Sequence, residues 1–198
     1  MLDNVLRKVC EPCVSDVSRK VKKIGFHPNT WTLLSLPFAI GASLFLAHRS
    51  WALALLFALA ALLCDVIDGA IARSAKQVTA FGNYLDAMVD RVVEIAFYLG
   101  LAFTYPLTAF LAMSGSFLVS YAKARASLVK KIGNRDVPVL GERFDRMAVL
   151  LVGMFLAIFL PAVLGVETMN LALALIAALA YVGSVQRFFS IKQLLGKD

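Results

Sequence analysis

Residues 51–63 read WALALLFALAALL, an apolar run that carries no charged residue. Apolar and polar residues do not alternate along it with a period of two, as they do in the strands of a membrane β-barrel. Its leucines and alanines are strong helix formers. Extended to Ala72, the run has the length of about 20 mostly apolar residues that a helix needs to cross a bilayer. This stretch therefore predicts a transmembrane helix.

The rest of the chain has the same apolar character. Of its 198 residues, 60% are hydrophobic and 17% are charged, with a mean hydropathy of +0.78. A soluble domain is roughly 45–50% apolar and about 25% charged, and one of this size could not bury so much apolar surface. We therefore expect an all-α integral membrane protein. Its six transmembrane helices are predicted at Thr30–Ala47, Trp51–Ala72, Leu85–Thr104, Tyr105–Ala126, Met147–Leu164 and Met169–Phe188.

The residues before the first predicted span form an amphipathic pattern. Apolar residues recur at steps of three and four between Leu6 and Ile24, and lysines and arginines occupy the other positions. This pattern is typical of a helix that lies in the plane of the lipid headgroups. The expected organisation is a juxtamembrane amphipathic helix over residues 1–28 and a six-helix membrane domain over residues 29–198.

The net charge of +7 is distributed unevenly. If the six predicted helices cross the membrane, every Lys and Arg except Arg49 falls on one side of it. The positive-inside rule makes that side cytoplasmic, so we expect a cell-membrane protein whose two termini face the cytoplasm. The basic residues follow the membrane boundary without a nucleic-acid-binding motif. We therefore expect anionic lipid headgroups as partners, and no nucleic acid.

Four carboxylates lie near the cytoplasmic ends of two predicted spans. Asp65 and Asp68 are three residues apart, and Asp86 and Asp90 are four apart, so each pair shares one helix face. A short loop joins the two helices, which makes them antiparallel neighbours and lets the pairs converge. An aspartate costs about 2.5–3.5 kcal/mol at the centre of a span, so bare anions would be unfavourable here. Hard oxygen ligands in this arrangement predict a site for one or two Mg²⁺ or Mn²⁺ ions.

Two other interpretations of the acids have to be weighed. The carboxylates could pair with Arg73 and Arg91 between the helices, but two arginines cannot neutralise four carboxylates. A divalent-cation transporter would also carry acids inside its spans. Here all four acids lie at one end of the membrane, and the apolar runs 51–63 and 97–104 leave no polar path through the other half.

The acids belong to a longer pattern with fixed spacing. It reads Asp65-x-x-Asp68-Gly69-x-x-Ala72-Arg73-x(8)-Gly82-x(3)-Asp86-x(3)-Asp90. The pattern resembles the signature of the CDP-alcohol phosphotransferase family at every fixed position, and the resemblance extends over residues 26–190. Members of this family transfer a phosphate-linked alcohol group from a CDP-alcohol to an acceptor hydroxyl and release CMP. The resemblance therefore implies a transferase of phospholipid biosynthesis that works as a homodimer.

The resemblance also implies roles for individual residues. Asp65, Asp68 and Asp86 would hold two divalent ions, and Asp90 would complete the second metal site and serve as the general base. The acidic site, and with it the active site, would face the cytoplasm. The residues implied in binding the CDP nucleotide are Asn29, Thr32, Asp65, Gly69, Ala72, Arg73 and Gly82.

The acceptor is indicated by a second set of positions. The sequence Asp86-Ala-x-x-Asp90-Arg91 resembles the phosphatidylinositol-phosphate synthase branch, as do Glu142-Arg143-x-x-Arg146 and Gln186-Arg187. This implies a CDP-lipid donor, carrying diacylglycerol or archaeol, and inositol 1-phosphate as the acceptor; glycerol 3-phosphate or another alcohol is the alternative. Charge-assisted contacts suit a phosphate dianion. The residues implied in binding the acceptor's phosphate are Lys123, Arg125, Arg143, Arg146 and Arg187.

Overall fold

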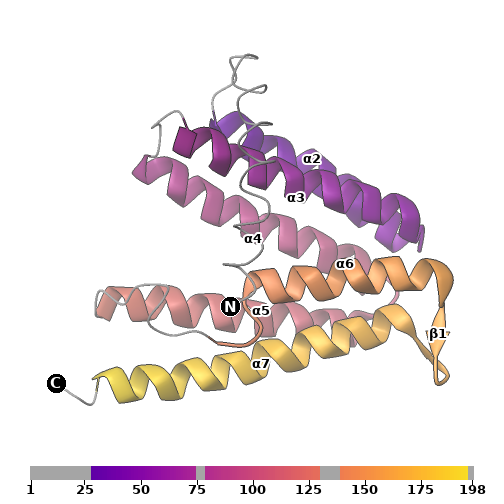
Figure 1. Cartoon of the computed structure of the whole chain (residues 1–198). Helices are drawn as coiled ribbons and strands as arrows, with labels where there is room; N and C mark the ends of the chain where they lie inside the picture. Colours follow the sequence, from indigo (N-terminus) through magenta and orange to yellow (C-terminus); the bar gives the residue numbers. More distant parts are fainter. Residues whose placement is uncertain (1–27, 75–78, 130–138, 196–198) are drawn as a thin grey trace. The chain divides into compact units, whose positions relative to one another are not determined.

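The computed structural model describes residues 28–74, 79–129 and 139–195, and this part of the chain is helical apart from its loops and one short hairpin (Figure 1). The amphipathic helix expected over residues 1–28 lies outside the described residues, except for Pro28. The six helices are α2 (Pro28–Ala47), α3 (Trp51–Ser74), α4 (Ala80–Ala102), α5 (Pro106–Val129), α6 (Arg143–Phe159) and α7 (Thr168–Leu195).

Each of the six predicted helices overlaps one observed helix, but several ends differ. α4 begins five residues before the predicted start and α7 continues seven residues beyond the predicted end. The prediction for residues 147–164 is also wrong at both ends. α6 begins four residues earlier, at Arg143, and ends at Phe159. Beyond it, β1 (Ala162–Val163) pairs antiparallel with β2 (Val166–Glu167). Pro161 has no amide hydrogen with which to continue the helix. Leu164 and Gly165 then reverse the chain with φ angles of 51° and 79°.

Within the described residues, four helices are long and apolar enough to cross a membrane, namely α2, α3, α5 and α7. α4 carries Asp86, Asp90, Arg91 and Glu94 within its 23 residues, and α6 is only 17 residues long. The structure thus supports an all-helical protein with several membrane-spanning helices.

The chain divides into two compact units, residues 1–100 and 101–198. In the first unit, α2 and α3 pack together along their length (Figure 1). Phe57 lies against Phe38 and Phe45 with ring centroids 6.2 and 5.1 Å away. α4 approaches α2 at Gly100, where a Cβ atom would overlap the backbone of Ser43. Small residues at such contacts allow membrane helices to approach closely.

In the second unit, α5 and α6 pack on α7. A Cβ atom on Gly153 would lie 2.6 Å from the Cβ of Ala172, so this crossing also depends on a glycine. Near the hairpin, the Tyr105 hydroxyl donates a hydrogen bond to Glu167. The Oγ1 of Thr108 donates to Asn170 over 2.7 Å. These polar contacts fix the start of α5 to the start of α7.

The turn before α6 packs against α7. Gly141 has a φ of +69°, and a Cβ there would overlap the Leu179 carbonyl. A Cβ on Gly183 would in turn overlap the carbonyl oxygen of Leu140. The Leu140 amide donates to Oε1 of Gln186 over 3.1 Å. The position of this turn determines where Glu142 and the first turn of α6 lie.

We expect Gly183→Ala to lower the free energy of unfolding by about 1–3 kcal/mol, because the added methyl group must push the Leu140 turn away from α7. Thermal unfolding of the purified protein in detergent would measure this change. Ala174→Leu enlarges an exposed position of the same helix and is the matched control. Equal stability of the Gly183→Ala variant and the unmodified protein would contradict the packing described.

Candidate active site

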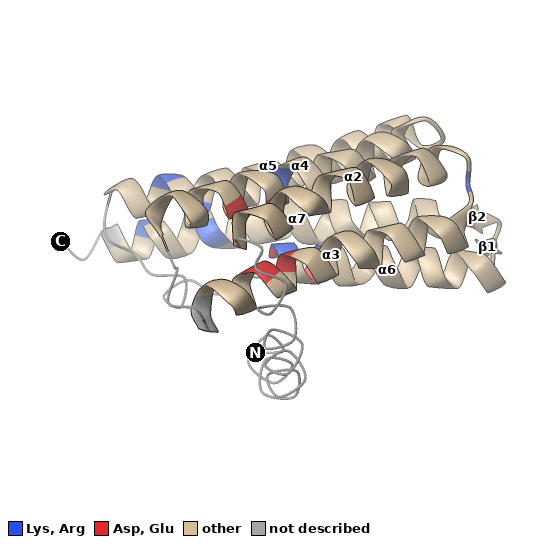
Figure 2. Cartoon of the chain, turned by 90° about the horizontal axis from the view of Figure 1, so that it is seen from above, with Lys and Arg blue, Asp and Glu red and all other residues tan. Residues whose placement is uncertain are grey.

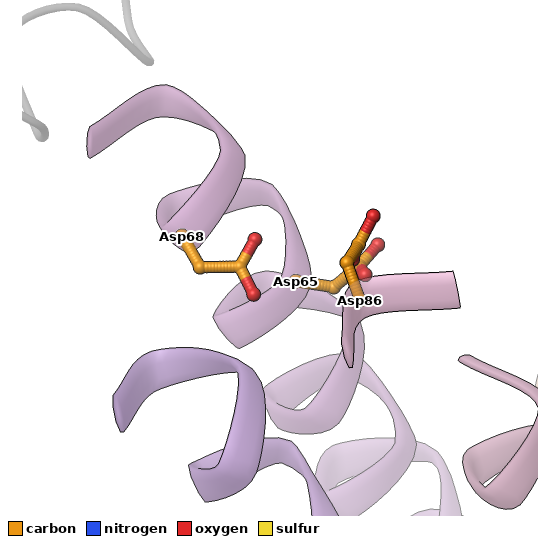
Figure 3. A group of neighbouring side chains, drawn as sticks. All are labelled: Asp65, Asp68 and Asp86. Atoms are coloured by element: carbon orange, nitrogen blue, oxygen red, sulfur yellow. The ribbon is translucent and has the colours of Figure 1, made fainter. Parts of the chain in front are cut away.

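Three of the four predicted metal ligands come together in the first unit. Asp65 and Asp68 project from α3 toward Asp86 of α4, as Figure 3 shows. One carboxylate oxygen of each lies within 4.8 Å of the others. Asp68 is buried, and Asp65 and Asp86 are partly buried. Three hard oxygen ligands at this separation fit a divalent cation such as Mg²⁺ or Mn²⁺.

Asp90 lies one turn beyond Asp86 on the same face of α4, as the spacing of four predicts. Its side chain is partly buried. Among the described residues, the carboxylates with oxygens within 4.8 Å of one another are those of Asp65, Asp68 and Asp86. Asp90 does not belong to this group. Its predicted roles as a ligand of a second ion and as the general base remain predictions.

Thr32 of α2 is a direct partner of the acidic cluster. Its hydroxyl donates a hydrogen bond to Oδ2 of Asp68, and both side chains are 5% exposed. The backbone around Thr32 is itself held, since the Ser35 hydroxyl donates to the Thr32 carbonyl over 2.7 Å. A buried carboxylate needs such donors, and a hydrogen bond of this kind fixes the orientation of a metal ligand. The sequence predicted a nucleotide contact for Thr32 and missed this bond.

Two further predicted nucleotide residues lie close together. A Cβ on Gly82 would stand 3.5 Å from Oδ1 of Asn29 and 3.0 Å from Oγ1 of Thr79. The Thr79 hydroxyl also accepts a hydrogen bond of 2.9 Å from the Gly82 amide at the start of α4. The lack of a side chain at Gly82 thus lets α4 begin beside the first turn of α2.

The remaining predicted nucleotide residues follow Asp68 along α3. Gly69 and Ala72 are partly buried. Arg73 belongs to the last turn of α3, and its side chain lies outside the described part of the structure. For these three residues, the structure establishes the helix but not a contact with the cluster.

One acidic residue of α4 was missed by the sequence analysis. Glu94 is 3% exposed and forms an ion pair of 2.6 Å with Arg91. It also accepts a hydrogen bond of 3.3 Å from the Tyr98 hydroxyl. The signal was present in the sequence, because Glu94 continues the steps of four from Asp86 and Asp90. Arg91 is therefore engaged within its own helix.

In the second unit, the described basic residues gather at the end opposite the hairpin, on the last turns of α5 and α7 and the first turn of α6 (Figure 2). The most buried of them are Arg146, which has no exposed surface, and Arg187, which is 3% exposed. Arg146 donates from Nη1 to the carbonyl oxygen of Gly141. Arg187 donates from Nη1 to the carbonyl of Val119 over 3.1 Å. Both buried guanidinium groups are thus held in place by backbone carbonyls, one in the turn before α6 and one on α5.

The other predicted phosphate-binding residues differ in exposure and in the helix face on which they lie. Arg143 is the first residue of α6 and is partly buried. Lys123 follows Val119 by one turn of α5 and is partly buried, whereas Arg125 is exposed. Helix spacing therefore places Lys123 on the α5 face that Arg187 contacts. Arg125 lies on a different face.

Glu142 also belongs to this basic cluster, and no role was predicted for it. Its carboxylate forms an ion pair of 2.8 Å with Nη2 of Arg187. Its amide donates to Oδ2 of Asp145 over 3.2 Å, in a capping box at the start of α6. The sequence motif contained this glutamate, but nothing in its spacing indicated Arg187 as its partner.

Comparison with known proteins agrees with this geometry. The sequence model of the CDP-alcohol phosphatidyltransferase family matches residues 26–185. The archaetidylinositol phosphate synthase of Pyrococcus horikoshii is 27% identical over 200 residues, which cover 98% of each chain. The synthase of the same name from Aeropyrum pernix is 32% identical over 199 residues, which cover 95% of each chain.

Solved structures of Mycobacterium tuberculosis phosphatidylinositol phosphate synthase have the same fold. The crystal structure with bound CDP-DAG superposes with a TM-score of 0.76 at 24% sequence identity, over 90% of this chain and 92% of that one. The structure of that protein with manganese and citrate gives a TM-score of 0.77 at 24% identity, over 90% of this chain and 88% of that one.

We expect the purified protein to bind Mn²⁺, and Asp86→Asn to weaken that binding at least about tenfold by removing a ligand. Thr32→Val removes the hydrogen bond to Asp68 and is expected to weaken binding about tenfold as well, the usual scale for an outer partner of a metal ligand. Electron paramagnetic resonance of free Mn²⁺, in the absence of nucleotide, measures both affinities.

Two variants control this experiment. Thr32→Ser keeps the hydroxyl and is expected to bind Mn²⁺ like the unmodified protein. Thr108→Val makes the Thr32→Val change in the second unit, where Thr108 bonds to Asn170. Unchanged Mn²⁺ affinity in Thr32→Val would show that this hydrogen bond does not orient Asp68.

Proposed function

Because this chain belongs to the CDP-alcohol phosphatidyltransferase family, we propose that it transfers a phosphatidyl-type group from a CDP-lipid to the hydroxyl of inositol 1-phosphate and releases CMP. The observation that carries the proposal is the convergence of Asp65, Asp68 and Asp86 from two adjacent helices, at the spacing of the family's signature. The choice of acceptor is supported by the two archaetidylinositol phosphate synthases that match this chain over nearly its whole length.

In this proposal, the acidic cluster of α3 and α4 binds the donor's diphosphate through divalent ions. Asp65, Asp68 and Asp86 hold divalent ions, with Asp90 as a ligand of the second, and the manganese in the M. tuberculosis structure supports this assignment. Bound there, the ions neutralise the diphosphate and stabilise the leaving oxygen of CMP. Asn29, Thr32, Gly69, Ala72, Arg73 and Gly82 form the surroundings of the cytidine nucleotide.

Asp90 receives the proton of the acceptor hydroxyl. The hydroxyl oxygen forms a bond to the phosphorus that carries the lipid, and the bond between that phosphorus and the bridging oxygen of the diphosphate breaks. CMP leaves with the bridging oxygen, and the proton passes to the Asp90 carboxylate. Asp90 suits this role because its carboxylate can accept a proton and it lies one turn from Asp86, on the same face of α4.

The acceptor's phosphate is bound by the basic cluster of the second unit. Arg146 and Arg187 provide its buried part, and Arg143 and Lys123 lie at its border. Arg125, which is exposed, contributes charge at longer range. An inositol phosphate carries about two negative charges near neutral pH, and arginine forks bind such groups with two parallel hydrogen bonds.

In a membrane, all six helices α2–α7 cross the bilayer in this proposal, with the active site and both termini on the cytoplasmic side. The concentration of lysines and arginines supports this orientation, because Arg49 alone falls on the other side. α4 carries four charged residues and α6 has only 17 residues, so these two spans rest on the proposal more than the other four do. The proposal also includes the homodimer implied by the sequence resemblance.

We expect CMP release when the purified protein is incubated with a CDP-lipid, Mg²⁺ and inositol 1-phosphate, and loss of that release in EDTA, because the reaction needs the divalent ions. The donor arms are CDP-archaeol and CDP-diacylglycerol. Release only with glycerol 3-phosphate would keep the aspartate site and overturn the acceptor. The absence of release with either donor and all acceptors would contradict the proposed function.

We expect Asp90→Asn to lower kcat by about a hundredfold or more, the lower end of what a general base contributes. Glu167→Gln neutralises a carboxylate bonded by Tyr105 at the hairpin and should leave turnover unchanged. Size-exclusion chromatography of both variants tests whether they are folded. Retained turnover in folded Asp90→Asn protein would exclude Asp90 as the base.

A further inference from the structure

The ion pair between Arg187 and Glu142 is unequal in exposure. The Arg187 side chain is 3% exposed, whereas that of Glu142 is 40% exposed. Arg187 cannot leave its position without breaking its bond to the Val119 carbonyl on α5. Glu142 is the N-cap residue of α6, and its side chain also accepts a hydrogen bond from the backbone amide of Asp145 in the capping box. Because that side chain is 40% exposed, water can replace these contacts when it turns outward. The cation is thus fixed and the carboxylate is exchangeable.

The Arg187 guanidinium has further capacity for an anion. It donates from Nη1 to Val119 and from Nη2 to Glu142, while its buried Nε has no hydrogen-bond partner among the described residues. A guanidinium offers five N–H donors in a planar fork, and its Nε and one Nη together fit two oxygens of a phosphate. Glu142 occupies the Nη2 donor of that guanidinium, and the Nε donor is left for a second oxygen of an anion.

We propose that Glu142 is an internal substitute for the acceptor's phosphate, which neutralises Arg187 in the empty enzyme and is displaced when a phosphomonoester binds. The proposal rests on the function assigned to Arg187 above. A buried arginine without a counter-charge is strongly unfavourable, so the empty site requires an anion. When a phosphate dianion takes that place, the Glu142 carboxylate becomes a like charge beside it and turns outward.

This exchange would make the acceptor site selective. An acceptor without a phosphate, such as free inositol, has no charge with which to displace the carboxylate, so Arg187 stays occupied. A phosphomonoester forms charge-assisted hydrogen bonds to the guanidinium, which offset the loss of the ion pair with Glu142. Glu142 therefore acts as a specificity-determining residue through its effect on Arg187, and it does not contact the reacting atoms.

The test is the affinity for inorganic phosphate, measured by isothermal titration calorimetry on the full-length protein in detergent. Glu142→Gln keeps an oxygen acceptor for Arg187 and for the α6 cap but removes the competing charge. We expect it to bind phosphate about fivefold more tightly, as the loss of a partly exposed ion pair predicts. Asp145→Asn is the control, because it removes one negative charge from the other residue of the capping box. We expect its effect on the binding free energy of phosphate to be less than half of the effect of Glu142→Gln.

The same variant changes the kinetics in a defined way. Glu142→Gln should lower KM for the phosphorylated acceptor about fivefold with kcat unchanged, whereas a loss of structure would lower kcat or raise KM. Unchanged or weaker phosphate binding in Glu142→Gln, or no phosphate binding by either protein, would overturn the proposal. Failure of the proposed function would show instead as a lack of CMP release in the unmodified protein, whatever the calorimetry gives.

Discussion

The structure depends on one constraint, that a charged side chain buried in a membrane helix needs a partner. The described residues meet it in three ways. Asp68 receives a hydrogen bond from Thr32 of the neighbouring helix, Glu94 is bound by residues of its own helix, and Arg187 pairs with Glu142. The first and third of these contacts join separate elements, so the charges to which we assign a chemical role also help to determine where those elements meet.

Glycines allow close approach of the backbone near two of these contacts. Gly82 lets the start of α4 lie beside Asn29, and Gly183 lets the Leu140 turn lie against α7. A hydrogen bond or an ion pair acts over about 3 Å, so the backbones that carry the two partners have to approach closely. Gly183 therefore helps to hold the turn before Glu142 close to the helix that carries Arg187.

The sequence predicted the six helices and the acidic cluster because both are local patterns. Asp65 and Asp86 lie on helices joined by a short loop, so their spacing determines that they converge. The hairpin after Phe159 was not predicted, since its apolar residues continue the composition of the helix and Pro161 is the sole break before it. The partners of Asp68 and Arg187 were missed because each is more than 30 residues away along the chain.

The two proposed sites also differ in whether their residues are close together or far apart in the sequence. The proposed donor site lies on two adjacent helices, so the spacing of its carboxylates predicts the acidic cluster, and the resemblance to the family adds the chemistry of CMP release. The acceptor cluster combines residues from α5, α6 and α7, and its charges have value only in the pairs that they form. Short motifs contain Glu142, Arg143 and Arg146, but the ion pair that joins Glu142 to Arg187 spans 45 residues of the chain. The arrangement of the proposed acceptor site therefore depends on contacts that these motifs do not contain.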